Sequence, residues 1–354
     1  MRHHSRSLAR SLLVAFVALP ALARSQATPE PKSETGVVTW TAGDSLSAPR
    51  DHHVVFVTQS RSGAHLFVAG GNTYRAVLDD VWRASIGADG AARGWERLAP
   101  LPSARAGHSV ISTEGVVIIT AGKGADQKNI AETLIAKVSD DGALSPWTRG
   151  PDLPGPRFHH SMAAHDQFLY VTGGLEGNTS VASVFRAQVG PDGTVSRWTV
   201  LDDLPKPRSH HASFVHNGAL YLVAGLNGNP AAEHEQLRDV VRAPIRADGS
   251  LGEWTTVSTL PHAYGTHSAV AHDGFVYLVG GVEDNARFSD AILRAPINAD
   301  GSLGDWVRVE SSLPAPRSHV HQTPVHRGRL YSVGGSARRQ VTGQVWVGTV
   351  KGKG

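Results

Sequence analysis

The chain has 354 residues, with 34 Lys and Arg against 31 Asp and Glu, and it contains no cysteine. The lack of cysteine excludes disulfides and attachment of a lipid through a thiol. A formal net charge of +3 is far from the basic excess expected of a nucleic-acid-binding protein, so no nucleic-acid partner is predicted.

The first 27 residues are predicted to be a secretory signal peptide. Arg2, Arg6 and Arg10 form a basic start, an apolar run covers 12–22, and small residues allow cleavage near Ala23 or Ala27. The apolar run is about half of the roughly 20 residues that a membrane-spanning helix needs. Cleavage would leave 30 Lys and Arg against 31 acidic residues. We therefore expect a secreted or periplasmic protein with no membrane span, in which residues 28–36 form a flexible lead-in.

Six copies of one unit follow, and they recur every 51 to 56 residues. A period of this length, built from short strands and turn signals, indicates a radial or stacked repeat. The copies are marked by tryptophans at nearly even spacing: Trp40, Trp95, Trp147, Trp198, Trp254 and Trp306.

The fourth copy, residues 204–259, shows the predicted strands most clearly. A strand over 211–216 runs into Asn217-Gly218, which is a strong signal for a tight hairpin. A second strand is expected over 219–223, a third over 239–245, and a fourth around Trp254 after the turn at 248–249. Four antiparallel strands in each unit predict a propeller blade.

The sixth copy, residues 313–350, supplies only three strands. The missing fourth strand is expected near the start of the chain, over 36–46, where Trp40 stands in register with the other tryptophans. Pairing of this segment with the last blade would close the ring and remove an exposed sheet edge. We therefore predict an all-β, six-bladed propeller that occupies residues 37–350 as a single domain.

At these residues the chain resembles the kelch-repeat family. The shared pattern is Pro-Arg-x-x-His, then a hairpin, then a strand such as Leu-Tyr-Leu-Val-Ala-Gly at 220–225, then a tryptophan. The resemblance covers residues 37–350. It implies the propeller fold, whereas kelch propellers include both enzymes and binding scaffolds, so it decides little about function.

Two columns of histidine recur in the units. The first column is expected to be structural and buried, and counting back from the Gly-Gly or Ala-Gly pair gives His53, His108, His160, His211, His267 and His321. The residue just before it alternates to the other side of the strand. In kelch proteins that bind peptides, this position contacts the ligand at the mouth of the central channel. We therefore predict a binding site at His52, His159, His210 and, displaced by one inserted residue, His319.

Two further groups complete the candidate binding site. The repeated arginines are expected to be structural, but Arg157 and Arg208 could steady a ligand carboxylate if either faces the mouth. The loop over 226–239 is the longest of its kind and carries Glu233, His234 and Glu235. Variable loops on a rigid frame are the usual place for function, so this loop is predicted to form a side wall or lid.

No metal and no cofactor are predicted. The four mouth histidines fall in the first, third, fourth and sixth copies, which does not favour one ion shared by all; two histidines with Glu233 or Glu235 remain conceivable. The resemblance implies two further comparisons. Iron-binding kelch proteins of plants carry Glu-x-x-x-Asp-x-x-x-His, but Ala243 stands where that histidine should be. Kelch-type copper oxidases need a tyrosine cross-linked to cysteine, which this chain lacks.

The favoured function is binding of a glycan, an acidic sugar or a protein at the channel mouth. Histidine, arginine and carboxylate side chains suit hydroxyl-rich or anionic ligands. The first alternative is a cofactor-free sugar isomerase or lyase, because similar exported kelch propellers include sialic-acid mutarotases. In that case His159 and His210 would be the acid and base, since an ordinary histidine pKa of about 6.5 suits proton transfer. The second alternative is a structural surface module.

Overall fold

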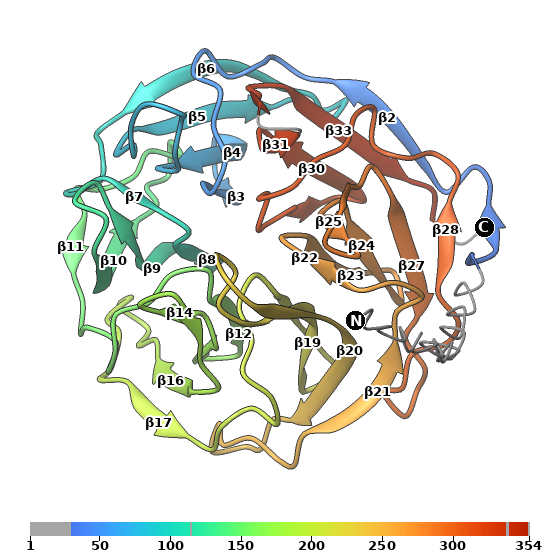
Figure 1. Cartoon of the computed structure of the whole chain (residues 1–354). Helices are drawn as coiled ribbons and strands as arrows, with labels where there is room; N and C mark the ends of the chain where they lie inside the picture. Colours follow the sequence, from blue (N-terminus) through green and yellow to red (C-terminus); the bar gives the residue numbers. More distant parts are fainter. Residues whose placement is uncertain (1–29, 114, 338–339, 353–354) are drawn as a thin grey trace, which may run out of the picture.

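The structure is a computed structural model that describes residues 30–113, 115–337 and 340–352. The predicted signal peptide lies outside the described residues. Six larger sheets, here called blades 1 to 6 in the order of their first strands, stand around a central axis (Figure 1). Among the described residues there is no helix long and apolar enough to cross a membrane.

Each blade is an antiparallel sheet whose first strand lies nearest the axis and whose fourth strand lies at the rim (Figure 1). Blade 1 contains β3 (Val54–Ser60), β4 (Gly63–Ala69), β5 (Val81–Ile86) and β6 (Ala92–Leu98). Blade 2 contains β8 (Ser109–Thr113), β9 (Val116–Gly124), β10 (Asn129–Lys137) and β11 (Thr148–Arg149), and β7 (Arg105–Ala106) also pairs with β9. Blade 3 contains β12 (Ser161–His165), β13 (Phe168–Thr172), β16 (Val184–Gln188) and β17 (Thr199–Leu201).

The other three blades follow the same order. Blade 4 contains β18 (Ala212–His216), β19 (Ala219–Gly228), β20 (His234–Pro244) and β21 (Thr255–Thr259). Blade 5 contains β23 (Ser268–His272), β24 (Phe275–Val279), β27 (Ile292–Pro296) and β28 (Val307–Val309). Blade 6 contains β29 (Val325–His326), β30 (Arg329–Val333), β33 (Val345–Val350) and β2 (Val38–Ala42). Three small ribbons complete the structure: β14–β15 (Leu175–Glu176, Thr179–Ser180), β22–β25–β26 (Tyr264–Gly265, Val282–Glu283, Arg287–Phe288) and β31–β32 (Ser336–Ala337, Gln340–Val341). Apart from β22, which precedes blade 5, their strands lie in sequence between the second and third strands of blades 3, 5 and 6.

The N-terminal strand closes the ring, as the sequence predicted. β2 pairs antiparallel with β33, from Val38 opposite Val350 to Ala42 opposite Trp346. Within the predicted lead-in over residues 28–36, Ser33–Glu34 forms β1, which pairs in parallel with β28, and the Glu34 carboxylate accepts hydrogen bonds from Arg294.

The hydrophobic core is divided between the blades. Six clusters of buried side chains occur, and each joins two neighbouring blades. The cluster between blades 6 and 1, for example, packs Tyr331 and Val333 against Val55 and Leu66. The blades therefore stabilise one another around a closed circle, and burial of this apolar surface is the main source of stability.

Polar side chains add a second set of contacts between blades. The hydroxyls of Tyr170, Tyr221 and Tyr331 each donate a hydrogen bond to a glycine carbonyl in the next blade, at 2.9 to 3.0 Å. Four of the repeated tryptophans donate a hydrogen bond toward the preceding blade, namely Trp40, Trp95, Trp198 and Trp306. Trp95 Nε1, for example, donates to the Asp44 carbonyl at 2.7 Å. These two residue types recur because each supplies an apolar body and one donor at a fixed place in the blade.

Candidate functional site

The mouth of the central channel is formed by one residue from each blade. These six residues all have a left-handed backbone, with φ between 52° and 62°. Such a conformation is uncommon for side chains other than glycine, and it persists only where the surroundings enforce it. The six residues, here called the mouth ring, are His52, Gly107, His159, His210, Thr266 and His319.

Backbone hydrogen bonds enforce this conformation. Each mouth-ring N–H donates to the carbonyl of the mouth-ring residue in the preceding blade, at 2.7 to 3.1 Å, and the amide of His52 completes the circle by donating to His319. All six bonds run in the same direction around the axis. The left-handed backbone is therefore a property of the frame, whereas the side chain at each position is free to differ.

The four predicted mouth histidines lie together. His159 stacks on His210, with 3.8 Å between ring centroids, and His52 lies 4.2 Å from His319 and 4.9 Å from His159. They come from blades 1, 3, 4 and 6, and the channel is narrow enough for their rings to meet at the axis. The four imidazoles therefore form one cluster in the channel.

A fifth histidine belongs to the same group. His321 was placed in the structural column, but its ring lies 5.0 Å from that of His159 and 5.8 Å from that of His52. Val320 takes the structural position instead, since it faces Gly335 as His53 faces Gly71. His319 is therefore not displaced, and the inserted residue brings His321 into the channel.

The insertion is accommodated in the first strand of blade 6. β29 has two residues, whereas the corresponding strands in blades 2 to 5 have five. Pro324 precedes it and has no N–H with which to extend the pairing. The sequence does contain a signal for this arrangement. Counting forward from Pro316-Arg317 places His319 at the position of His52, and His321 then falls outside the repeated histidine columns.

Three histidines of the mouth ring are oriented by neighbouring side chains, and the Nδ1 atom of His210 lies 3.0 Å from the Ser209 hydroxyl. His52 Nδ1 donates to the Asp51 carboxylate at 2.7 Å, and Asn72 Nδ2 donates to the same oxygen at 2.9 Å. His319 Nδ1 lies 3.0 Å from the Ser318 hydroxyl. Because a carboxylate can only accept, the proton of a neutral His52 is on Nδ1 and its Nε2 carries a lone pair. Asp51 was not identified from the sequence, although blade 1 is the one repeat with an acid at that place.

Burial controls the charge of this group. The pKa of His159, of His210 and of His321 lies well below the ordinary histidine value, because burial penalises the imidazolium and neighbouring imidazoles repel a second charge. The same effects lower the pKa of His319 to about 3. At pH 7 burial therefore favours the neutral form of both His159 and His210, the pair predicted as acid and base.

Cavities lie on both sides of the histidines. A mouth pocket of about 210 Å³ has six polar or aromatic residues in its lining, namely His52, Asn72, Lys123, Gln127, Phe158 and His159. A channel cavity of about 290 Å³ is lined by the innermost strands and by His321. His52 and His159 thus face the mouth pocket, and His321 faces the channel cavity.

The two candidate arginines do not reach the ligand site. Arg157 and Arg208 are 1% and 0% exposed. Arg157 donates to the Gly173 carbonyl at 2.9 Å, and Arg208 pairs with Asp239 at 2.9 Å. Both guanidinium groups are used inside their own blades, so neither can hold a ligand carboxylate.

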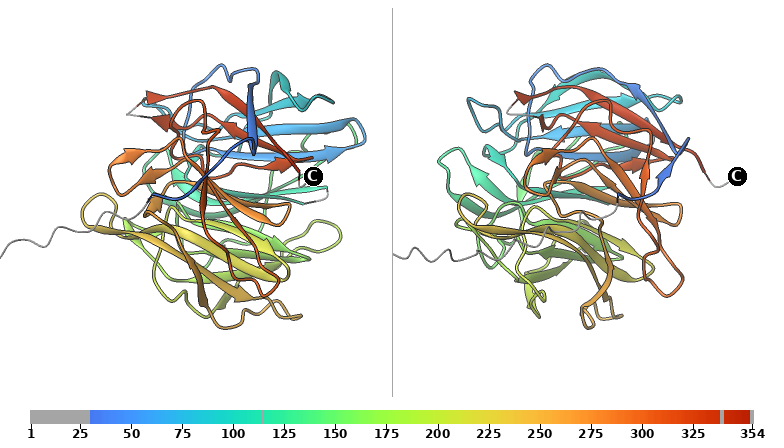
Figure 2. Two further views of the ribbon diagram at one scale, coloured as in Figure 1. Left: turned by 90° about the vertical axis from the view of Figure 1, so that its right-hand side faces the viewer. Right: turned by 45° about the vertical axis from the view of Figure 1, so that its right-hand side comes forward.

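The predicted lid is instead a hairpin. Most of 226–239 extends β19 and β20, from Gly228 opposite His234 to Gly225 opposite Leu237, and the hairpin projects beyond the body of the sheets (Figure 2). Glu233 is exposed, and Glu235 pairs with Lys206 at 3.0 Å. His234 Nε2 lies 3.0 Å from the Asn285 amide oxygen, which ties the hairpin to blade 5. None of the three lines the mouth pocket.

The structure is a closed propeller, and histidine side chains line the mouth of its central channel. A sequence profile described as the KLHDC2/KLHL20/DRC7 Kelch-repeats domain matches residues 63–281, more than half of the chain. The protein therefore belongs to the kelch-repeat family, as the sequence motifs indicated. Domains of this family bind proteins and other ligands.

Individual relatives are distant. The chain is 25% identical to alpha-scruin of Limulus polyphemus over 245 residues, which cover 68% of this chain and 26% of scruin. It is 26% identical to kelch-like protein terF of Aspergillus terreus, covering 68% of this chain and 52% of that protein. Among solved structures, YjhT superposes with a TM-score of 0.62 at 14% identity, covering 75% of this chain and 86% of YjhT. The chain spans between a quarter and about half of these curated relatives, and the likeness to YjhT shows the fold alone.

Proposed function

We propose that the protein binds a small anionic, hydroxyl-rich ligand of the acidic-sugar class in the mouth pocket. The observation that carries this proposal is Lys123. Its Nζ lies 5.1 Å from the centre of the Phe158 ring at the edge of the pocket, and among the described residues no carboxylate pairs with it. A cation above an aromatic face, beside imidazole and amide groups, suits a carboxylate on a sugar ring.

The size of the pocket limits the ligand. A volume of about 210 Å³ is below the roughly 300–1,000 Å³ typical of sites for drug-sized molecules. One sugar ring is a better match than an oligosaccharide. Asn72 and Gln127 offer both donors and acceptors for hydroxyl groups, and His52 offers its Nε2 lone pair.

The test is calorimetric titration of the full chain, in the presence of a chelator, with uronic acids, a sialic acid and neutral hexoses. An acidic sugar should bind, and Lys123→Met should weaken it about tenfold or more, because a charge-assisted hydrogen bond contributes about 1.5–3 kcal/mol. Lys128→Met is the matched control, since Lys128 lies in the same hairpin and already pairs with Asp126 at 3.5 Å. Equal affinities in wild type and Lys123→Met would disprove the assignment, and binding of none of these sugars would favour a protein ligand or a structural module.

One observation supports a second function, which is acid–base catalysis on the bound sugar. The Asp51–His52 pair has the geometry in which a carboxylate orients an imidazole and stabilises its charged form. If the ligand undergoes anomer exchange, His52 is the base, in place of His159 and His210. Exchange measured by NMR should fall by at least about a hundredfold in His52→Gln, because general base catalysis contributes about that much.

We also propose that the protein is exported, on the basis of the basic and apolar start of the chain. N-terminal sequencing of the protein recovered from the periplasm or medium should give a start near residue 24 or 28. Recovery of the intact N-terminus from the cytoplasm would contradict this.

A further inference from the structure

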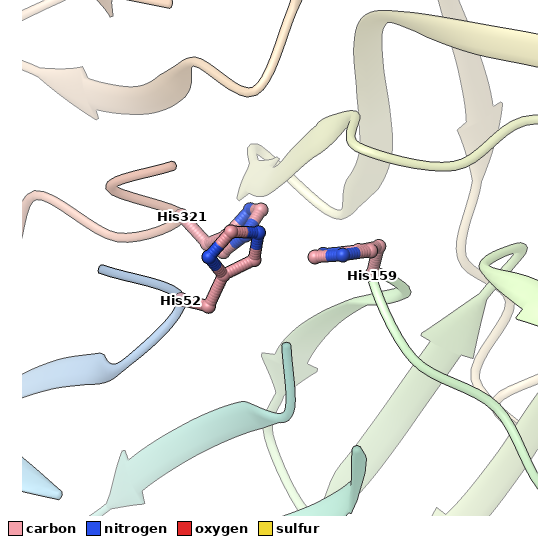
Figure 3. Close-up of side chains that lie close together, drawn as sticks. All are labelled: His52, His159 and His321. Carbon is pink, nitrogen blue, oxygen red and sulfur yellow. The ribbon is translucent and has the colours of Figure 1, made fainter. Parts of the chain in front are cut away.

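We propose that His52, His159 and His321 form a binding site for a divalent first-row transition ion, of the Zn²⁺ and Cu²⁺ class, on the axis of the propeller. One ring nitrogen from each of the three lies within 4.8 Å of the other two. Figure 3 shows the His159 ring pointing toward the rings of His52 and His321. This site adjoins the proposed sugar site and shares His52 and His159 with it, but it does not include Lys123.

The distances are compatible with one ion after small movements. Zn–N bonds are about 2.0–2.1 Å, so two nitrogens on a tetrahedral ion are about 3.4 Å apart. The side chains can close the remaining gap by rotating about χ1 and χ2, while the mouth-ring backbone stays fixed. Two of the three ligands, His52 and His159, come from that hydrogen-bonded ring.

Two buried nitrogens in this group lack hydrogen-bond partners. His159 Nδ1 and His321 Nε2 have no partner among the described residues, and His159 is 6% exposed. Buried polar atoms are nearly always satisfied, so two unpartnered nitrogens within one histidine cluster call for an explanation. Coordination of an ion would satisfy them at once.

The outer contacts resemble those of known metal sites. Metal-binding histidines commonly donate their second ring N–H to a carboxylate, which fixes the tautomer and strengthens the ligand. His52 does so with Asp51, whose carboxylate is held in turn by Asn72. Gly107 leaves the room for the His159 ring, because a Cβ at that position would lie 3.0 Å from His159 Cε1.

The ligand chemistry selects the class of ion. Three imidazoles suit Zn²⁺, Cu²⁺ or Ni²⁺, whereas Mg²⁺ and Ca²⁺ require oxygen ligands. Three protein ligands leave a fourth position open, which is the arrangement of zinc sites that bind water or a substrate. His52 and His159 line the mouth pocket, so that position is reached from the mouth.

The experiment is titration of chelator-treated full chain with Zn²⁺ and Cu²⁺, with Mg²⁺ as the negative control. We expect one equivalent of Zn²⁺ to bind, and Co²⁺ to give the intense visible absorption of a low-symmetry four-coordinate site. His159→Gln and His321→Gln should each weaken Zn²⁺ binding at least tenfold. His165→Gln and His216→Gln, at hairpin turns away from the mouth, should leave it unchanged.

A second measurement does not depend on any variant folding. X-ray absorption and Cu²⁺ electron paramagnetic resonance of wild-type protein loaded with one equivalent should show three imidazole nitrogens. Fewer than three, or stoichiometric binding that persists in the His159→Gln/His321→Gln variant, would overturn the assignment. Absence of stoichiometric binding would do the same. Metal binding should be retained in Lys123→Met, so failure of the sugar site and failure of the metal site can be told apart.

Discussion

Acid stability can be tested through one structural histidine, His160. This residue is buried and its Nε2 lies 2.8 Å from the Thr120 hydroxyl of the neighbouring blade. Burial, with a smaller contribution from the nearby Arg157 charge, lowers its pKa to about 3. The perturbation we consider is His160→Gln, which keeps a polar side chain but removes the titrating group.

The magnitude follows from linkage. A folded pKa below the unfolded value of about 6.5 means that the unfolded chain takes up the proton first as the pH falls. The contribution of the neutral ring to the free energy of unfolding is therefore fully present above about pH 6.5. It is lost progressively as the pH falls from that value to the folded pKa. Between pH 7 and pH 5 the loss attributable to His160 is about 2 kcal/mol.

The assay is urea denaturation at the two pH values. At pH 7 we expect His160→Gln to be less stable than wild type by about 1 kcal/mol, because a buried hydrogen bond is lost or weakened. At pH 5 this deficit should vanish or change sign, since the variant escapes the protonation penalty.

Thr120→Val is the matched control. It removes the same hydrogen bond and no titrating group, so its deficit should be equal at pH 7 and pH 5. If His160→Gln also shows the same deficit at both values, then the ring is not held neutral by burial and the reasoning is refuted.

Three further predictions test the frame. Gly107→Ala should destabilise the protein by about 1–2 kcal/mol in urea, because φ is +62° and the new Cβ would press on His159; no effect would show that this ring can move aside. Tyr221→Phe should cost about 1 kcal/mol at the melting transition, because it leaves the Gly301 carbonyl without its buried donor; an unchanged Tm would mean that water replaces it. Removal of residues 1–46 should lower Tm strongly and promote aggregation by light scattering, since it exposes the β33 edge, whereas removal of 1–29 should not.

The sequence carried most of the information on the frame. Alternation and hairpin signals predicted fourth-copy strands over 211–216 and 219–223. The observed strands are Ala212–His216 and Ala219–Gly228, so the starts agree to within one residue and the second strand runs further than predicted. Closure by β2 was predictable from counting strands, since the last copy lacked one. Local chemistry decides these features, so a single sequence is enough to predict them.

The site was predicted only in part, because it depends on distances across the axis. The repeated histidine columns predicted His52, His159, His210 and His319 as site residues. They did not predict that the imidazole rings from these four blades lie in contact. His321 was assigned by counting back from the glycines, and this count fails because the insertion is absorbed between Val320 and β29. The repeat indicates a structural role for Arg157 and Arg208, but only the structure shows that neither guanidinium group faces the mouth pocket.

The mouth ring has a consequence for how such a protein could acquire new specificity. The left-handed backbone and its hydrogen bonds are the same with histidine, glycine or threonine in place, so a substitution at the positions that already carry a side chain changes the chemistry facing the axis while the hydrogen-bonded ring is kept. Single mutations at these positions can therefore change the binding centre step by step, whereas Gly107 is constrained by the His159 ring beside it. The present chain, with histidine at four of the six, is one outcome of that evolvability.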